Sequence, residues 1–264
     1  MTTDDGYLLA NRQAEAAHRF DTFAELFDPA SFRRLAALGL GSGWRVWEIG
    51  AGSLHVPRWL AEQVGPAGQV LTTDIDTRWL ADPPAGVEVR RHDVAAEPPP
   101  AGPFDLVHAR LVLVHLPDRQ RALNSMLAAL RPGGWLLVED ADPALQPLAC
   151  PDEAGEPERL ANLVRRGFRQ LLAERGADLA YGRTLPRLLR SAGLVSVAAE
   201  GQFPYGGQAS RELEAATVRQ LRDQLLAAGL VTEAQLDEHL ANLAAGELEL
   251  ATAPMIAAWG RKPA

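Results

Sequence analysis

The stretch EIGAGSLHVPRWL, residues 48–60, follows an apolar run and carries two closely spaced glycines ahead of a segment with a helical pattern. Glycines between a strand and a helix let a ligand approach the main chain and the free N–H groups at the helix N-terminus. Pro57 is tolerated only in the first turn of that helix, which places the helix start close to Ser53. The stretch therefore predicts a strand–turn–helix unit of the kind that holds a nucleotide cofactor.

The segments around this stretch alternate between strand and helix patterns. Strand patterns occur in WRVWEIG, GQVLTTDID, VEVRRHDV, FDLVHARLVLV and GGWLLVEDAD, and a single helical segment joins the first two. This spacing is typical of a βαβ unit, which connects parallel strands by a right-handed crossover. The alternation predicts an α/β fold with a doubly wound sheet.

From about Pro143 the rhythm breaks, and most of the remaining segments are helical, with strand patterns only in LVSVAAEGQF and in the final APMIAAWGRK. One of the helical segments is expected to begin with a capping box formed by Thr232 and Gln235. We expect a single domain over residues 1–264, in which the helical insertions form a lid and substrate pocket. Its expected parts are a helical preface (1–40), a cofactor-binding core (41–140), helical insertions (141–182 and 210–246) and a final strand (247–264).

The composition argues against several classes of protein. The formal net charge of -8 and the pI near 5.3 do not suit a surface that neutralises nucleic-acid phosphates. The single cysteine, Cys150, offers no cluster for zinc, and we expect no metal site. The N-terminus lacks the pattern of a signal peptide, and no apolar run approaches the roughly 20 residues that cross a bilayer. We expect a cytoplasmic monomer or homodimer that binds neither nucleic acid nor membranes.

The glycine turn is consistent with two kinds of cofactor, one with a pyrophosphate and one without. A dinucleotide site favours G-x-G-x-x-G, whose third glycine permits close packing of helix and strand beside the pyrophosphate. His55 occupies that third position, which disfavours a pyrophosphate and hence an NAD(P)-dependent oxidoreductase. A cofactor without a pyrophosphate needs a close approach only at the first part of the turn.

Acidic residues follow the next two strands. Asp74 lies about twenty residues after the glycines, where a carboxylate can accept hydrogen bonds from both hydroxyls of a ribose. The alternative is that Asp74 or Asp76 only caps a following helix. Asp93 ends the third strand and would face an adenine amino group at the same edge of the sheet. These positions suit an adenosine-containing cofactor.

Taken in order, EIGAG, TTDID, RHDV, FDLVHARLVLVHLPD and LRPGGWLLVED resemble the class I S-adenosylmethionine-dependent methyltransferases, in particular the small-molecule enzymes of the ubiquinone-biosynthesis-like type. The likeness covers residues 41–140 and, more loosely, the final AAWGRKP. It implies a Rossmann-like, seven-stranded sheet with an antiparallel last strand, S-adenosylmethionine as cofactor and S-adenosylhomocysteine as product. The chain departs from the family at position 54, where leucine replaces the third glycine of many members.

The resemblance also implies which residues surround the cofactor. Glu48, Gly50 and Gly52 would border its methionine part, Asp74 would bind the ribose and Ile75 would lie against the adenine. Asp93 and Val94 would contact the adenine edge, and Ala109 and Arg110 would pass beneath the ribose and methionine. Tyr7 and Arg19, from the helical preface, would close over the methionine end.

We therefore expect transfer of a methyl group to an oxygen, nitrogen or carbon of a small molecule, such as a secondary metabolite. The alternative is a protein of the same fold that binds the cofactor without methylating, such as a cyclase, pericyclase or regulator. His115 and His18 are the candidates for proton transfer, because histidine titrates near neutrality. The alternatives are a structural role for His115, which we favour, and a solvent-facing position for His18. His92, His108 and His239 carry no functional signal in the sequence.

Overall fold

The computed structural model describes residues 15–264, which divide into two units. The unit that contains the sheet, called here the sheet unit, comprises Asp28–Ala141, Tyr181–Gly201 and Met255–Ala264. The other, called the helical unit, comprises Asp142–Ala180, Gln202–Pro254 and the described residues 15–27. The expectation of one domain with a helical lid stays a prediction.

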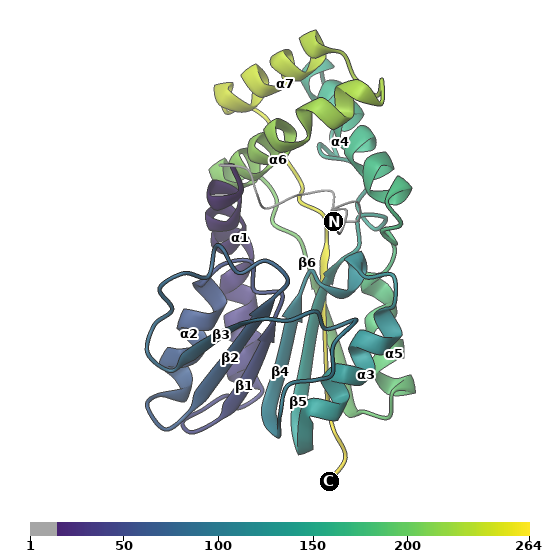
Figure 1. Cartoon of the computed structure of the whole chain (residues 1–264). Helices are drawn as coiled ribbons and strands as arrows, with labels where there is room; N and C mark the ends of the chain where they lie inside the picture. The colour runs from purple at the N-terminus through teal and green to yellow at the C-terminus, as the bar shows by residue number, and fades with distance from the viewer. Residues whose placement is uncertain (1–14) are drawn as a thin grey trace. The chain divides into compact units, whose positions relative to one another are not determined.

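The sheet unit is built on a seven-stranded sheet of order β3-β2-β1-β4-β5-β7-β6 (Figure 1). Its strands are β1 (Arg45–Ile49), β2 (Gln69–Asp74), β3 (Val87–Arg91), β4 (Phe104–Arg110), β5 (Leu130–Ala141), β6 (Val195–Gln202) and β7 (Met255–Arg261). β7 pairs antiparallel with β5, whereas β1 to β5 pair in parallel. The order reverses between β1 and β4, which is where such sheets bind ligands. The predicted fold, including the antiparallel last strand, is confirmed.

Helices cover both faces of this sheet. They are α1 (Glu15–Ala37, which contributes its residues from Asp28 onward), α2 (His55–Val64), α3 (Arg119–Ala129) and α5 (Leu185–Ser191), with the short 3₁₀ helices η1 (Leu113–His115) and η2 (Gly182–Thr184). Neighbouring residues of each central strand point to opposite faces. In β1, Val46 packs in the cluster with Leu35 of α1 and Leu60 of α2, whereas Trp47 packs in the cluster with α3 and α5. Both faces are therefore buried, which explains the continuous apolar runs of these strands.

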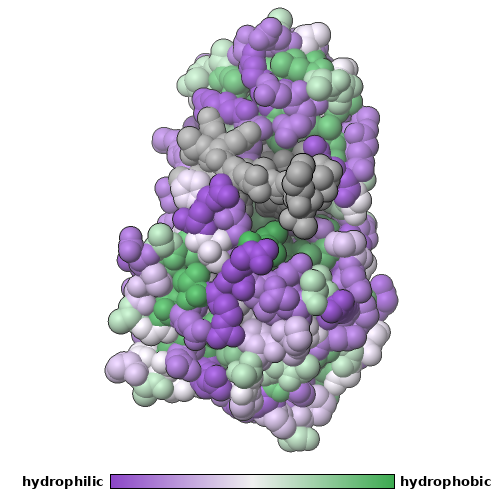
Figure 2. Space-filling model, viewed as in Figure 1, coloured by the Kyte–Doolittle hydropathy of each residue, from purple (hydrophilic) through white to green (hydrophobic). Residues whose placement is uncertain are grey.

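The helical unit contains α4 (Glu156–Glu174), α6 (Gly207–Ala227) and α7 (Glu233–Ala245). Their apolar faces meet in a cluster that includes Leu160, Leu221 and Leu236. The predicted capping box is confirmed at α7, where Gln235 N donates to Thr232 Oγ1 at 3.3 Å and Thr232 N donates to Gln235 Oε1 at 2.9 Å. None of the helices within residues 15–264 is both long and apolar enough to cross a bilayer. On the face drawn in Figure 2, hydrophilic residues lie among the apolar ones over most of the surface.

Three element boundaries differ from the sequence-based expectation. β4 ends at Arg110, four residues early, because Leu111 adopts a positive φ of 56° and turns the chain into η1. α2 begins at His55 rather than near Ser53, with Leu54 as its N-cap, so Pro57 still lies in the first turn. β3 ends at Arg91 and not at Val94. The shortened β4 matters for the site, because His115 now lies in a 3₁₀ turn and not directly after a strand.

Candidate cofactor-binding site

The turn after β1 is shaped by its two glycines. Gly50 and Gly52 have φ values of 64° and 62°, a region that other residues adopt only with strain. Gly50 N donates to Thr73 O at 2.7 Å, and Gly52 N donates to Asp74 Oδ2 at 2.9 Å. The turn is therefore bound to the carboxyl end of the neighbouring strand β2, and its backbone lies at the edge where strand order reverses.

Asp74 ends β2 with a carboxylate that is 9% exposed. Its two oxygens accept the backbone N–H groups of Gly52, at 2.9 Å, and Asp76, at 3.0 Å. Burial raises the pKa of Asp74, while these hydrogen bonds oppose the rise. A carboxylate oxygen accepts more than one hydrogen bond, so Asp74 can still receive hydroxyl donors from a ligand. The chain runs from β2 to β3 through residues 75–86 without a regular helix, so the alternative that Asp74 or Asp76 caps a helix is wrong.

The other residues predicted to face the adenine lie next to Asp74 in the sheet. Ile75 follows Asp74 directly and is 60% exposed, which is high for a large apolar side chain. Asp93 lies two residues after β3, where its Oδ1 accepts the N–H of Ala95 at 2.9 Å. The side chain of Val94 is buried in the core cluster of the sheet unit. Their contacts with a cofactor stay predictions.

Replacing Gly50 with alanine is expected to destabilise the sheet unit by about 2 kcal/mol more than replacing Gly43 with alanine. Both glycines have positive φ, but a Cβ at Gly50 would lie 2.4 Å from Val112 Cγ2, whereas one at Gly43 would meet nothing within 4 Å. All six tryptophans lie in the sheet unit, so urea unfolding followed by tryptophan fluorescence reports on this unit. Adding Val112→Ala should restore part of the loss; equal losses for both glycine variants would contradict the tight turn.

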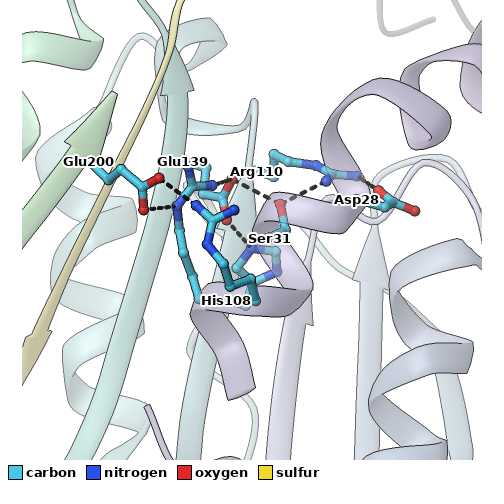
Figure 3. Close-up of polar contacts among 8 residues, drawn as sticks. Asp28, Ser31, His108, Arg110, Glu139 and Glu200 are labelled. Atoms are coloured by element: carbon cyan, nitrogen blue, oxygen red, sulfur yellow. Dashed lines mark hydrogen bonds and ion pairs between the residues drawn. The ribbon is translucent and has the colours of Figure 1, made fainter. Parts of the chain in front are cut away.

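Beneath the turn, buried ionisable side chains cross three adjacent strands on one face of the sheet. Glu48 of β1 pairs in register with His108 of β4, and His108 Nδ1 lies 2.6 Å from Glu48 Oε2. On the other side of the ring, His108 Nε2 lies 3.6 Å from Glu139 Oε1, an ion-pair distance rather than a hydrogen bond. All three side chains are almost completely buried. Figure 3 shows His108 and Glu139 in this network.

Residues of α1 complete the network from above the sheet (Figure 3). Ser31 Oγ donates to Glu139 Oε2 at 2.9 Å, and Arg34 Nη1 lies 3.3 Å from the same oxygen. Arg110, at the end of β4, donates to Asp28 Oδ1 at 2.7 Å and to Ser31 Oγ at 3.0 Å. The Arg110 side chain therefore ties α1 to β4, and only its backbone is left for the predicted place beneath the ribose and methionine, where Ala109 precedes it as a buried β4 residue.

His108 is held as a cation by its surroundings. Burial lowers the pKa of its imidazole, but the charges of Glu48 and Glu139 outweigh burial and raise the pKa from the ordinary value of 6.5 to about 9. The pKa of Glu139 is lowered in spite of its burial, because His108, Arg110 and Arg34 are all nearby cations. The raised pKa favours the protonated form of His108 near neutral pH, and the residue lies in β4 beside Glu48 of β1.

The raised pKa makes the stability of the sheet unit depend on pH. His108 contributes stability that is fully present below its ordinary pKa of 6.5 and is lost as pH rises through about 9. We expect His108→Gln to cost on the order of 2–3 kcal/mol at about pH 6 and much less at about pH 10. Urea unfolding at both pH values, followed by tryptophan fluorescence, measures the difference. A loss that is the same at both pH values would show that His108 is neutral in the fold.

The residues predicted for proton transfer and for the methionine end lie in different units. His115 ends η1 in the sheet unit and is half-buried. His18 and Arg19 belong to the α1 residues of the helical unit, where His18 is exposed and Arg19 is buried. Tyr7 lies outside the described residues. The structure thus places the predicted site residues from Glu48 to His115 in the sheet unit, and the role of every predicted site residue stays a prediction.

Sequence reasoning missed His108, and it missed Glu139 with its partners Ser31 and Arg34 on α1. The sequence offered one relevant signal. Glu48 and His108 both lie in central strands, and the alternation of side chains along a strand allows them to share one face of the sheet. Using that signal requires the register of β1 against β4, which the sequence alone does not provide.

Comparisons with known proteins agree with the geometry of the strand ends. A family model described as "Methyltransferase domain" matches residues 8–199. The chain is similar to "Methyltransferase str2" of Strobilurus tenacellus, with 36% identity over 165 residues, which cover 60% of this chain and 55% of that protein. It is similar to the ubiquinone/menaquinone biosynthesis C-methyltransferase UbiE of Nitrosospira multiformis, with 32% identity over 117 residues, which cover 42% of this chain and 48% of that protein. The chain spans about half the length of these curated relatives.

Solved structures show likeness of fold. Phosphoethanolamine N-methyltransferase 2 of Haemonchus contortus, in complex with phosphomonomethylethanolamine and S-adenosylhomocysteine, matches with a TM-score of 0.61 and 17% identity. The match covers 100% of this chain and 61% of that one. At this identity, the likeness extends to the arrangement of strands and helices.

Proposed function

Because the chain belongs to the methyltransferase-domain family, we propose that it transfers a methyl group from S-adenosylmethionine to an oxygen, nitrogen or carbon nucleophile of a small molecule, such as a secondary metabolite. The observation that carries the proposal is the contact between the glycine turn after β1 and Asp74 at the end of β2. The methyltransferase names of the curated relatives and the product bound to the solved Haemonchus contortus enzyme support the same reading.

The residues at the strand ends fit this cofactor. Gly50 and Gly52 adopt positive φ and carry no side chain, so that a ligand can lie against the backbone at these two positions. Asp74 offers a carboxylate to the paired hydroxyls of a ribose, and the exposed Ile75 beside it offers an apolar surface to a base. When bound, S-adenosylmethionine supplies a methyl group activated by the positive charge of its sulfonium sulfur. We propose that Glu48, Asp93, Val94, Ala109 and Arg110 line the remainder of the same site.

The main task left to the protein is orientation. A nucleophile aligned with an activated methyl group needs little more than proximity, which supplies about 7 to 11 kcal/mol in the most favourable intramolecular models. A base is needed only for acceptors that must lose a proton. We propose His115 and His18 as the residues to test for this role.

A transfer assay with labelled cofactor tests the proposal. The protein is incubated with S-adenosylmethionine carrying a labelled methyl group and a panel of small phenols, amines and activated carbon acids, and the organic extract is analysed for label. We expect label in at least one acceptor and none with the variant Asp74→Asn. Binding of the cofactor without transfer to any acceptor would instead favour a protein that binds S-adenosylmethionine and does not methylate.

A further inference from the structure

We propose that His108 is a positioning residue that supplies the counter-charge of Glu48, and through it sets the preference of the site between the methyl donor, which carries a sulfonium charge, and the demethylated product, which does not. This inference rests on the proposed function. It concerns how the buried network on one face of the sheet tunes the same site.

The geometry places the His108 ring between the two carboxylates. The His108 ring lies with Nδ1 2.6 Å from Glu48 Oε2 and Nε2 3.6 Å from Glu139 Oε1. Nδ1–H can donate to Glu48, and protonation of the ring adds a positive charge at ion-pair distance from both carboxylates. Because the three groups are buried, an uncompensated charge among them would be costly.

Glu139 has more cationic neighbours than Glu48. Glu139 also has Arg34 of α1, whose Nη1 lies 3.3 Å away, and the charge of Arg110 from β4 acts on it as well. Arg34 is shared in turn with Glu200 of β6, and Arg110 pairs with Asp28. Among the residues that the structure describes, His108 is the only cation within ion-pair distance of Glu48. Removing the charge of His108 therefore leaves Glu48 uncompensated and Glu139 still paired.

Glu48 is placed to affect the cofactor because it lies two residues before Gly50, at the carboxyl end of β1. Methyl transfer removes one positive charge from the cofactor. A carboxylate without a counter-ion would stabilise the charged donor more than the transition state, in which that charge is leaving the sulfur, and such binding slows the chemical step. With His108 protonated, Glu48 and His108 together are neutral, and donor and product bind with more similar affinity.

Calorimetric titration of the full chain with S-adenosylmethionine and S-adenosylhomocysteine tests the inference. At about pH 7, His108→Gln is expected to shift the ratio of the two affinities toward the donor by on the order of tenfold, the scale of one buried charge at an effective dielectric constant of about 20. The kcat of methyl transfer should fall while KM for the donor also falls. The matched control is Ser31→Ala, which breaks the hydrogen bond to Glu139 without removing a charge and should leave the ratio within about twofold.

The pH profile separates this role from a structural one. In the wild-type protein the affinity ratio should shift toward the donor as pH rises through the His108 pKa of about 9, and in His108→Gln it should stay flat at the shifted value. Glu139→Gln removes one of the charges that raise this pKa, so the shift should begin at lower pH. If His108→Gln does not fold, Glu139→Gln tests the role of His108 instead.

The failures of the two proposals are distinguishable. A wild-type protein that binds neither ligand overturns the proposed function. A wild-type protein that binds both, with an affinity ratio that His108→Gln leaves unchanged, or that Ser31→Ala changes equally, overturns the role of His108. The same holds if Glu139→Gln leaves the pH at which the ratio shifts unchanged.

Discussion

Replacing Asp74 with asparagine is expected to weaken the binding of S-adenosylhomocysteine by about two to four orders of magnitude, because two hydrogen bonds to a charged carboxylate are each worth about 1.5–3 kcal/mol. Asparagine is nearly isosteric, but its amide nitrogen turns a donor toward hydroxyls that need an acceptor. Calorimetric titration of the variant gives the affinity. Urea unfolding followed by tryptophan fluorescence shows whether the turn itself survives the change, since Asp74 also accepts the N–H groups of Gly52 and Asp76.

Asp76→Asn is the matched control for this prediction. Asp76 lies two residues away and accepts hydrogen bonds from the backbone and the side chain of Arg78, so its carboxylate serves its own turn. We expect this variant to bind the product within about threefold of the wild-type protein, as surface changes away from a site usually cost under 0.5 kcal/mol. Equal losses for Asp74→Asn and Asp76→Asn would move the ribose contact elsewhere.

The second large effect is expected in the helical unit, where Glu214→Gln should cost about 3–5 kcal/mol. Arg165 of α4 donates to Glu214 Oε2 of α6 at 2.8 Å, and His239 Nε2 of α7 lies 3.8 Å from Glu214 Oε1. Although burial raises the pKa of Glu214, the charge of Arg165 and the contact with His239 lower it to about 2. Glutamine would leave the buried Arg165 without a carboxylate, and an uncompensated buried charge is strongly destabilising.

Thermal unfolding followed by far-ultraviolet circular dichroism measures this loss. Tryptophan fluorescence serves as an internal reference, because no tryptophan belongs to the helical unit. Glu238→Gln on α7 is the matched control, since Glu238 is exposed. A transition temperature for Glu214→Gln equal to that of Glu238→Gln would mean that the Arg165 charge is satisfied without Glu214. The pH dependence has a definite sign: the stability that Glu214 contributes is present above its ordinary pKa of 4.5 and is lost as pH falls through about 2.

Much of the sheet could be predicted because local patterns determine it. The apolar runs around Val46, Leu106 and Leu137 indicate strands buried on both faces, and the glycines at 50 and 52 mark the turn between strand and helix. The position of Asp74 at the end of β2 follows from the same alternation. The antiparallel direction of β7 came from the family resemblance, because a strand pattern carries no direction.

The buried network could not be predicted for a physical reason. Arg110 contacts Asp28 across 82 residues of sequence, and Glu48 meets His108 across 60, so both contacts depend on strand register and helix packing. The end of β4 was mispredicted because the apolar run LVLV continues the strand pattern past Arg110, yet Leu111 adopts a positive φ. That conformation is imposed by the surrounding structure, since its N–H donates to Glu139 O at 2.8 Å.

The most direct test of the central claim is a calorimetric comparison of cofactors on the wild-type protein. Separate titrations with S-adenosylmethionine, S-adenosylhomocysteine and NAD ask which adenosine-containing ligand the strand ends of β1 and β2 accept. We predict micromolar binding of the first two and none of NAD, whose pyrophosphate does not suit a turn with His55 in the third glycine position. Preferential binding of NAD, or binding of none of the three, would contradict the account.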